Sequence, residues 1–190
     1  GFAPVKMDIL LKMARLEQLS DSDMEREQKA AMINPAAPNP SVEAILHAII
    51  PFKFVEHTHS DAVVTLTNLP NGEDLARDVF GSDAPLVPYI MPGFVLARKI
   101  FELTRDANWE KLTAIVLLNH GVFTFHDDAK VAYEKMIEIV SKAESALAKR
   151  KAFDAIRLGQ PRQSPSAVQL ATLRKKLSQV LGNPVITRLN

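Results

Sequence analysis

Cysteine is absent from the 190-residue sequence. Disulfide bonds, thiolate metal sites and a cysteine nucleophile are therefore excluded. A metal ion held by this chain must take its ligands from histidine, aspartate, glutamate and water. The five histidines are consequently among the most informative residues of the chain.

Glycine is also scarce, with seven residues that stand singly along the chain. Loops that bind dinucleotides or nucleoside triphosphates need closely spaced glycines, because the backbone must approach the phosphates. No such spacing occurs in this sequence. A Gly-rich nucleotide-binding loop is therefore absent from this segment.

An excess of either charge is missing as well, since 23 basic and 22 acidic residues leave a net charge of +1. This balance gives no electrostatic basis for binding nucleic acid or a membrane surface. No apolar run reaches the roughly 20 residues that a membrane-spanning helix needs, and no signal peptide opens the chain. We therefore expect no nucleic-acid partner, no membrane partner and a cytoplasmic location.

The composition is that of an ordinary globular domain, with 47% apolar and 24% charged residues. The length suits one domain with a substantial core. The chain begins at Gly1 rather than at an initiator methionine, and it ends soon after the apolar pair Val185 and Ile186. We therefore expect it to be a piece of a longer protein.

Apolar periodicity predicts helices and strands in mixed order. Strands are predicted over residues 52–59, 86–91, 113–119 and 122–125. Helices are predicted over residues 7–19, 21–33, 42–50, 94–103, 127–147 and 167–181, with a short helix or an irregular return over residues 61–68. Because these elements do not alternate as regular βαβ units, the pattern predicts an α/β sandwich with a mixed or largely antiparallel sheet.

The predicted helix over residues 42–50 carries a candidate functional carboxylate. Its apolar residues follow helical spacing, with Asn39 or Ser41 as the N-terminal cap and Pro51 as the stop. This places Glu43 in the first turn and His47 one turn later on the same face. The carboxylate of Glu43 either stabilises the helix N-terminus or takes part in chemistry.

The histidines point to a metal site. In His57-Thr58-His59, at the end of a predicted strand, alternate side chains project from one face, so both imidazoles can converge on one cation. His120 also ends an apolar strand, directly before Gly121, and strand ends are where α/β sheets place their chemistry. The alternative is a pair of solvated imidazoles on an edge strand. With Glu43, the three histidines predict an open site for zinc, whose bonds to nitrogen are about 2.1 Å long.

The sequence resembles the class II aldolase/adducin family from about residue 1 to residue 150. It shares short motifs with that family, in the family's order and at roughly its spacing. These motifs are Pro40-Ser41-Val42-Glu43, His57-Thr58-His59-Ser60-Asp61-Ala62, Val87-Pro88-Tyr89 and Leu117-Leu118-Asn119-His120-Gly121. Residues 34–142 look similar to the aldolase half of two-domain rhamnulose-1-phosphate aldolase/short-chain dehydrogenase proteins. The resemblance implies a three-layer α/β/α sandwich with a mixed, largely antiparallel central sheet.

The resemblance also implies a mechanism. The residues matching His57, His59 and His120 bind zinc in the family, and the residue matching Glu43 is the catalytic acid/base. Cleavage of a ketose 1-phosphate, such as rhamnulose 1-phosphate, gives dihydroxyacetone phosphate and lactaldehyde by way of an enediolate. A divalent cation stabilises the negative charge on its two adjacent oxygens, and Glu43 moves the proton at carbon.

Further residues receive roles from the same resemblance. Tyr89 matches a tyrosine that protonates or steadies the oxygen of the leaving aldehyde, although it can equally be a packed aromatic residue. Ser41 matches a serine that binds the substrate phosphate. We expect His47 to be a positioning or structural residue, and Asp61 to accept a hydrogen bond from one of the metal-bound imidazoles.

Other functions stay open on this scaffold. One is a sugar-phosphate epimerase or dehydratase; the related epimerases carry aspartate at the position of Glu43, which favours the aldolase. Another is a non-catalytic, adducin-like interaction module, whose members lack the zinc histidines.

The resemblance sets the expected organisation and partners. We expect an aldolase-like domain over residues 1–155, N-terminally incomplete because the Gly/Asn and Ser/Gly loops of the family's phosphate pocket have no counterpart here. Residues 156–190 are expected to form a linker and a helix leading toward a downstream domain. The expected partners are a small-molecule sugar phosphate and further copies of the chain, since the family forms tetrameric rings with sites at subunit interfaces.

Overall fold

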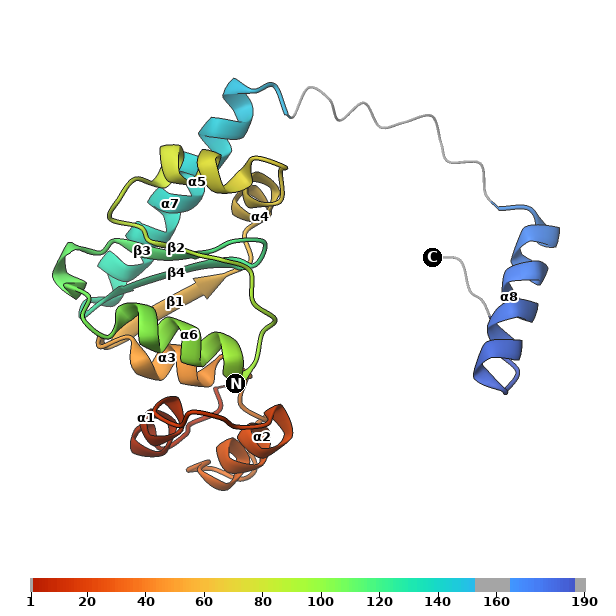
Figure 1. The fold of residues 1–190 in the computed structure, drawn as a ribbon, viewed down its shortest axis with the longest axis horizontal. Coiled ribbons are helices and arrows are strands. Elements are labelled where there is room, and N and C mark those ends of the chain that lie inside the picture. Colours follow the sequence, from red (N-terminus) through yellow and green to blue (C-terminus); the bar gives the residue numbers. More distant parts are fainter. Residues whose placement is uncertain (1, 153–164, 187–190) are drawn as a thin grey trace. The chain divides into compact units, whose positions relative to one another are not determined.

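The structure is a computed structural model that describes residues 2–152 and 165–186. They divide into two compact units, of which the first ends at Lys151. The elements of the first unit, labelled in Figure 1, are α1 (Met7–Ala14), α2 (Asp21–Ala30), α3 (Ala44–Ile49), β1 (Phe54–Thr58), α4 (Asp61–Thr67), α5 (Gly72–Phe80), β2 (Leu86–Val87), α6 (Phe94–Thr104), the 3₁₀ helix η1 (Trp109–Lys111), β3 (Ala114–Leu117), β4 (Gly121–His126) and α7 (Ala129–Lys149).

The sheet of the first unit has the strand order β1-β4-β3-β2. β1 pairs antiparallel with β4, β4 pairs antiparallel with β3, and only β2 joins in parallel. Helices α3 and α6 lie on one side of the sheet, and α4, α5 and α7 lie on the other (Figure 1). The predicted α/β/α sandwich with a mixed, largely antiparallel sheet is therefore confirmed.

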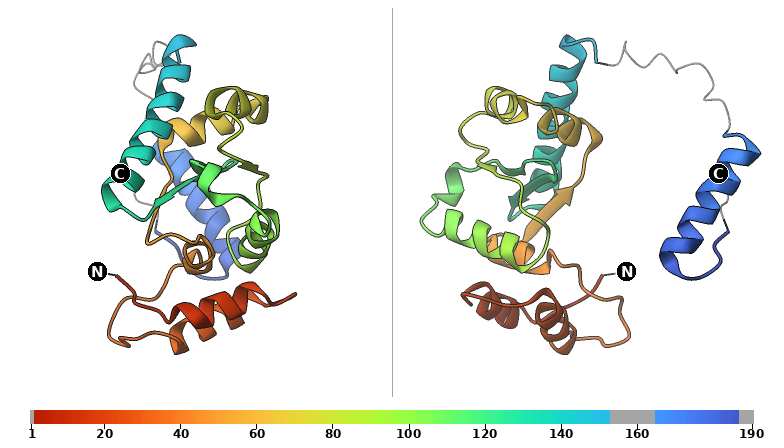
Figure 2. Two further views of the ribbon diagram at one scale, coloured as in Figure 1. Left: turned by 90° about the vertical axis from the view of Figure 1, so that its left-hand side faces the viewer. Right: turned by 45° about the vertical axis from the view of Figure 1, so that its right-hand side comes forward.

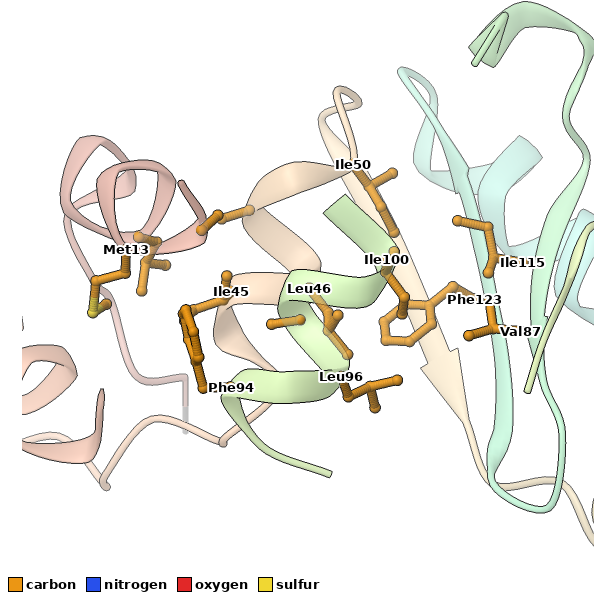
Figure 3. Close-up of a cluster of buried hydrophobic side chains, with 14 of the residues drawn as sticks. Met13, Ile45, Leu46, Ile50, Val87, Phe94, Leu96, Ile100, Ile115 and Phe123 are labelled. Carbon is orange, nitrogen blue, oxygen red and sulfur yellow. The ribbon is translucent and has the colours of Figure 1, made fainter. Parts of the chain in front are cut away.

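The main core lies between the sheet and helices α3 and α6 (Figure 3). Alternate residues of β3 and β4 enter it because successive side chains of a strand point to opposite faces. Its fully buried members include Ile45, Leu46, Leu96, Ile100, Ile115, Leu117, Phe123 and Phe125. Burying each such side chain contributes about 1.5–3 kcal/mol, so this core fixes α3 firmly against the sheet.

Helix α7 covers the opposite face of the sheet and begins as predicted at the acidic pair Asp127-Asp128. The side chain of Asp128 accepts hydrogen bonds from the backbone N–H groups of Lys130 and Val131, which caps the helix. On the sheet, buried Thr124 donates its hydroxyl to the carbonyl of Ala132 at 2.9 Å. None of the described helices is long and apolar enough to cross a membrane.

Helices α1 and α2 pack beyond α3 and α6, away from the sheet, as the two views of Figure 2 also show. The carboxylate of Asp21 accepts a hydrogen bond from the N–H of Phe94, the first residue of α6, at 2.9 Å. Arg98 of α6 donates to the carbonyl oxygens of Arg15 and Leu16 at 3.2 and 2.9 Å. Helix α6 thereby holds the N-terminal helices in place.

Several element boundaries differ from those predicted. The helix expected over residues 42–50 is shorter, Ala44–Ile49, because the hydroxyl of Ser41 accepts the N–H of Glu43 at 3.1 Å and bends the chain before the helix. Glu43 therefore occupies the N-cap position, not the first turn. The strand expected over residues 86–91 narrows to Leu86–Val87, because Pro88 has no N–H to pair. Helix α5 was not predicted.

The second unit contains α8, Ala167–Leu181, with the predicted boundaries. Ser166 and Gln169 form a capping box at its start, and Gly182 ends it in the left-handed conformation, at φ 68°. The predicted domain boundary after residue 155, and residues 156–164 at the start of the predicted linker, lie outside the described residues.

Candidate metal centre

Four side chains of the first unit converge on one point. They are Glu43, His57, His59 and His120, and one ligand atom from each lies within 4.8 Å of all the others. Glu43 is the N-cap residue of α3, and His57 lies in β1. His59 directly follows Thr58, the last residue of β1, and His120 lies in the turn between β3 and β4. The structure thus assembles the whole predicted ligand set and the predicted acid/base.

The strand pairing explains why these residues meet. In the antiparallel ladder of β1 and β4, His57 lies opposite Phe123 and Thr58 lies opposite Val122. The start of β4, and the turn that carries His120, therefore lie beside the end of β1. The imidazole of His57 stacks on the ring of Phe123 with centroids 4.0 Å apart, which keeps it on the face of the sheet that packs against α3.

A backbone carbonyl orients the first imidazole. Nδ1 of His57 lies 3.0 Å from the carbonyl oxygen of Val122. A carbonyl only accepts hydrogen bonds, so Nδ1 carries the proton, and in the neutral ring Nε2 presents its lone pair to the cluster. Although β1 is an edge strand, the side chain of His57 is only 9% exposed, whereas that of His59 is 59% exposed. The two imidazoles are therefore not a solvated pair.

The spacing of the ligand atoms fits a divalent metal ion. Oε1 of Glu43 lies 2.8 Å from Nε2 of His120 and 3.4 Å from Nε2 of His57. The Nε2 atoms of His57 and His59 are 2.9 Å apart. Ligand atoms about 2.1 Å from a tetrahedral zinc ion lie roughly 3.4 Å from one another. Three imidazole nitrogens with one carboxylate oxygen are also donors that zinc and related divalent ions prefer.

Close packing sets the charges of the cluster. Hydrogen bonding to His57, aided by the charges of His57 and His120, lowers the pKa of Glu43 to about 2, although partial burial opposes this. Burial lowers the pKa of His120 below its ordinary value, and the carboxylate of Glu43 opposes that shift. Near neutral pH, Glu43 is therefore a carboxylate and His120 is neutral, which are the forms that bind metals.

Gly121 leaves space for the imidazoles of His57 and His59, because it has no side chain. A Cβ atom added there would stand 2.4 Å from the carbonyl oxygen of Thr58, 2.9 Å from Cδ2 of His59 and 3.1 Å from Cε1 of His57. Any side chain would therefore push on His57, on His59 and on the backbone of Thr58 between them. The sequence signal was a glycine directly after the candidate ligand His120, but its steric reason is visible only in three dimensions.

Ser41, the predicted phosphate ligand, lies next to the cluster but outside it. Its hydroxyl is 3.5 Å from Oε2 of Glu43. It also borders a cavity of about 450 Å³ that is lined on the helix side by Ala44, His47 and Ala48. Its lining includes Ser41 and Ala44, on either side of Glu43 in the sequence, but neither Glu43 nor the three histidines of the cluster.

Tyr89 and Asp61 are not brought into the cluster. Tyr89 follows β2, is 53% exposed, and directs its hydroxyl to the sulfur of Met91 at 3.8 Å. Asp61 lies in the first turn of α4, and among the described residues it accepts no hydrogen bond from an imidazole. The acceptor found for His57 is the carbonyl of Val122 instead.

His47 lies between the cluster and the core. The centroid of its ring lies 5.3 Å from that of Phe123, in an edge-to-face arrangement, and 6.4 Å from that of His57. Burial is the main cause that lowers its pKa. This placement agrees with a positioning or structural residue.

Comparison with known proteins identifies the family. The family model described as the class II aldolase and adducin N-terminal domain matches residues 9–147. The chain belongs to this family. The resemblance seen in the sequence motifs is therefore confirmed, and the class II aldolase fold agrees with the architecture described above.

A curated relative and two solved structures are similar to this class II aldolase domain. The uncharacterized oxidoreductase YuxG of Bacillus subtilis (strain 168) is 33% identical over 144 residues, which are 76% of this chain and only 21% of YuxG. The N-terminal class II aldolase domain of a conserved protein from Thermoplasma acidophilum is 39% identical, with a TM-score of 0.69 over 76% of this chain and 66% of that chain. An aldolase II superfamily protein from Pseudomonas syringae, 15% identical, has a TM-score of 0.51 over 79% of this chain and 68% of its own and shows the fold alone.

The first prediction concerns metal content. The purified protein, loaded with zinc and freed of excess, should retain about one ion per chain, measured by elemental analysis. Replacing His57 and His59 together by alanine removes two of three imidazoles and should abolish retention. His126 lies outside the cluster, where its Nδ1 accepts the N–H of Asp128, and it provides the control His126→Ala. Undiminished zinc in the double variant would refute the centre.

The second prediction concerns Gly121→Ala. The added methyl group should displace the imidazoles and lower zinc affinity by about 10–100-fold, measured by competition with a chelator. Gly182→Ala is the control: a Cβ there meets nothing within 4 Å, and the strain that its left-handed φ of 68° imposes on alanine falls at the end of α8, in the second unit. Wild-type affinity in a folded Gly121→Ala protein would show that the close approach does not matter.

Proposed function

We propose that this class II aldolase domain is a zinc-dependent aldehyde-lyase. The reaction is the reversible cleavage of a ketose 1-phosphate, such as rhamnulose 1-phosphate, to dihydroxyacetone phosphate and lactaldehyde. The observation that carries the proposal is the convergence of Glu43 with three histidines on one point. Zinc is proposed over other divalent ions because the donor set is rich in imidazole.

The chemistry needs negative charge to be stabilised and one proton to be moved. As the bond between C3 and C4 breaks, the C4 hydroxyl loses a proton and the electron pair stays on C3, conjugated with the C2 carbonyl; C3 then gains a proton. A divalent cation in the centre would supply the Lewis acidity that stabilises this charge. The carboxylate of Glu43 is ionised near neutral pH and serves as the group that exchanges the proton at C3.

The remaining assignments concern the two ends of the substrate. Ser41 is proposed to contact the phosphate, since its hydroxyl is beside Glu43 and borders the adjoining cavity. Tyr89 is proposed to protonate or steady the oxygen of the leaving aldehyde. Its exposed position leaves its hydroxyl accessible to substrate or to another copy of the chain.

Other activities fit the observations less well. An adducin-like interaction module has no use for an assembled cluster of three imidazoles and a carboxylate. An epimerase or a dehydratase on the same scaffold remains the second candidate, and Glu43 favours the aldolase over the epimerase. The word oxidoreductase describes YuxG, of which this chain matches 21%. We propose that any oxidoreductase activity of YuxG belongs to a part of YuxG that this chain does not match. The glycine spacing of this segment does not suit a dinucleotide-binding loop.

The protein is also proposed to be cytoplasmic and to form homotetramers. Tyr89 and Met91, which precede α6, and Val95, near its start, are 53%, 70% and 66% exposed, and the hydroxyl of Tyr89 lies 3.8 Å from the sulfur of Met91. We propose that these three apolar side chains form a contact between molecules. Assembly of identical chains would cover them and bring Tyr89 close to a neighbouring copy.

The third prediction tests the reaction. A panel of ketose 1-phosphates is incubated with the zinc-loaded protein, in the longest form that its gene encodes, and released dihydroxyacetone phosphate is measured. Glu43→Gln should lower turnover by about 10²–10⁴-fold while zinc is retained, because the amide cannot exchange the proton. Glu56→Gln, next to His57 on β1 but outside the cluster, should remain active.

Three results would contradict this assignment. Absence of dihydroxyacetone phosphate with every substrate would exclude the aldolase. Full activity in Glu43→Gln would remove Glu43 from the chemistry. Loss of zinc in Glu43→Gln would make Glu43 a metal ligand in place of the acid/base.

The fourth prediction concerns assembly. Sedimentation velocity should show a tetramer, and Val95→Asp should dissociate it, because a buried unpaired charge in an interface is strongly unfavourable. Val168→Asp is the control, since Val168 is similarly exposed, at 74%, but lies on α8. A monomeric wild-type protein at micromolar concentration would contradict the proposed oligomer.

A further inference from the structure

The three imidazoles of the cluster are held in different ways. Nδ1 of His57 has the carbonyl of Val122 as its partner. Nδ1 of His120 is buried and has no hydrogen-bond partner among the described residues. Among the described residues, the only hydrogen-bond partner of the ring is therefore Oε1 of Glu43, 2.8 Å from Nε2 inside the cluster, so on its other side the ring of His120 depends on the backbone that carries it.

That backbone is a tight turn with an unusual conformation. His120 closes the turn by donating its N–H to the carbonyl of Leu117 at 3.2 Å. The residue before it, Asn119, has a φ of 60°. This lies in the left-handed region of backbone conformation, which residues other than glycine rarely adopt. Asparagine tolerates this conformation better than most residues, but the surrounding structure must still hold it in place.

The C-terminal end of α4 holds this turn through three hydrogen bonds. The N–H of Asn119 donates to the hydroxyl of Thr67 at 3.2 Å. Its side-chain amide donates to the carbonyl of Thr67 at 3.4 Å and to the side-chain oxygen of Asn68 at 2.6 Å. These contacts satisfy a carbonyl that the end of a helix leaves without an intrahelical partner.

Thr67 is itself firmly fixed. It is buried, and its hydroxyl donates back to the carbonyl of Val63 at 3.0 Å while it accepts from Asn119. A Cβ on Gly72, the first residue of α5, would lie 2.3 Å from the carbonyl of Thr67, so the two segments pack without space between them. Thr67 can therefore transmit the position of α4 to the turn.

Helix α4 joins the supports of two metal ligands. Its N-cap, Ser60, directly follows His59, and its last residue, Thr67, contacts the turn that carries His120. The seven residues of the helix span only about 10 Å. One short rigid element thus sets the distance between the loop of His59 and the turn of His120.

We propose that Thr67 and Asn119 are positioning residues for the metal ligand His120, and that α4 acts through them as a brace across the metal centre. The inference rests on the proposed function, because it concerns the same centre. It adds two residues that are outside the four-residue cluster. Loss of their hydrogen bonds should loosen His120 and weaken metal binding without removing a ligand.

The fifth prediction tests this brace with zinc as the probe on the whole chain. Thr67→Val keeps the shape of the side chain and removes the hydroxyl; Asn119→Gly keeps the left-handed backbone and removes the amide. Each should lower zinc affinity by about 10–100-fold in chelator competition. The visible spectrum of the cobalt-loaded variants should also change, because it reports coordination geometry.

Two further variants separate positioning from general stability. Thr67→Ser restores the hydroxyl and should recover the wild-type affinity and cobalt spectrum. Thr65→Val, an exposed threonine of the same helix, should change neither. Thermal unfolding of the metal-free proteins shows which variants are folded. If Thr67→Val does not fold, the zinc affinity of Asn119→Gly, which lies at an exposed turn, tests the brace instead.

The outcomes test the brace formed by α4 separately from the metal centre itself. If wild type binds zinc while Thr67→Val and Asn119→Gly bind it within about threefold of wild type, the brace is wrong and the metal centre stands. Failure of Thr67→Ser to restore binding would also overturn the brace. A wild-type protein that binds no zinc overturns the proposed function, and the brace with it.

Discussion

The antiparallel pairing of β1 with β4 is the interaction on which the metal centre depends. Its register sets His57 opposite Phe123 and brings the turn of His120 beside the end of β1. The same pairing places the carbonyl of Val122 where it can hold Nδ1 of His57. A slip of one residue would turn His57 to the other face of the sheet, away from Glu43. The large apolar residues of the core, which hold the register, therefore also hold the ligand geometry.

Packing against that ladder supplies the remaining parts. Helix α3 is fixed by its buried face on the core (Figure 3). It presents Glu43 from its N-cap. Gly121 lets the chain pass close to His57 and His59, and α4 connects His59 with the turn of His120. The centre is consequently a product of short, rigid connections rather than of one binding loop. This suits catalysis, which requires ligands and base in a fixed geometry.

Much of this could be predicted from the sequence, because the signals are local. Alternation placed His57 and His59 on one strand, and the apolar run before His120 marked a buried strand end. Shared motifs then indicated the family, which the comparisons confirmed. The N-cap position of Glu43 was missed because it depends on the hydroxyl of Ser41, and helix α5 was missed beside a turn signal. The roles of Val122 and Thr67 have no sequence pattern, since a carbonyl and a hydroxyl become supports only through tertiary contacts.

We propose that three imidazoles of this class II aldolase domain bind one divalent ion. X-ray absorption spectroscopy at the zinc edge is the decisive test, because multiple scattering from imidazole rings reveals how many of them coordinate the metal. We expect three imidazole nitrogens at roughly 2.0–2.1 Å, with oxygen completing the coordination shell. A shell with one imidazole or none, and oxygen in the other positions, would contradict this proposal.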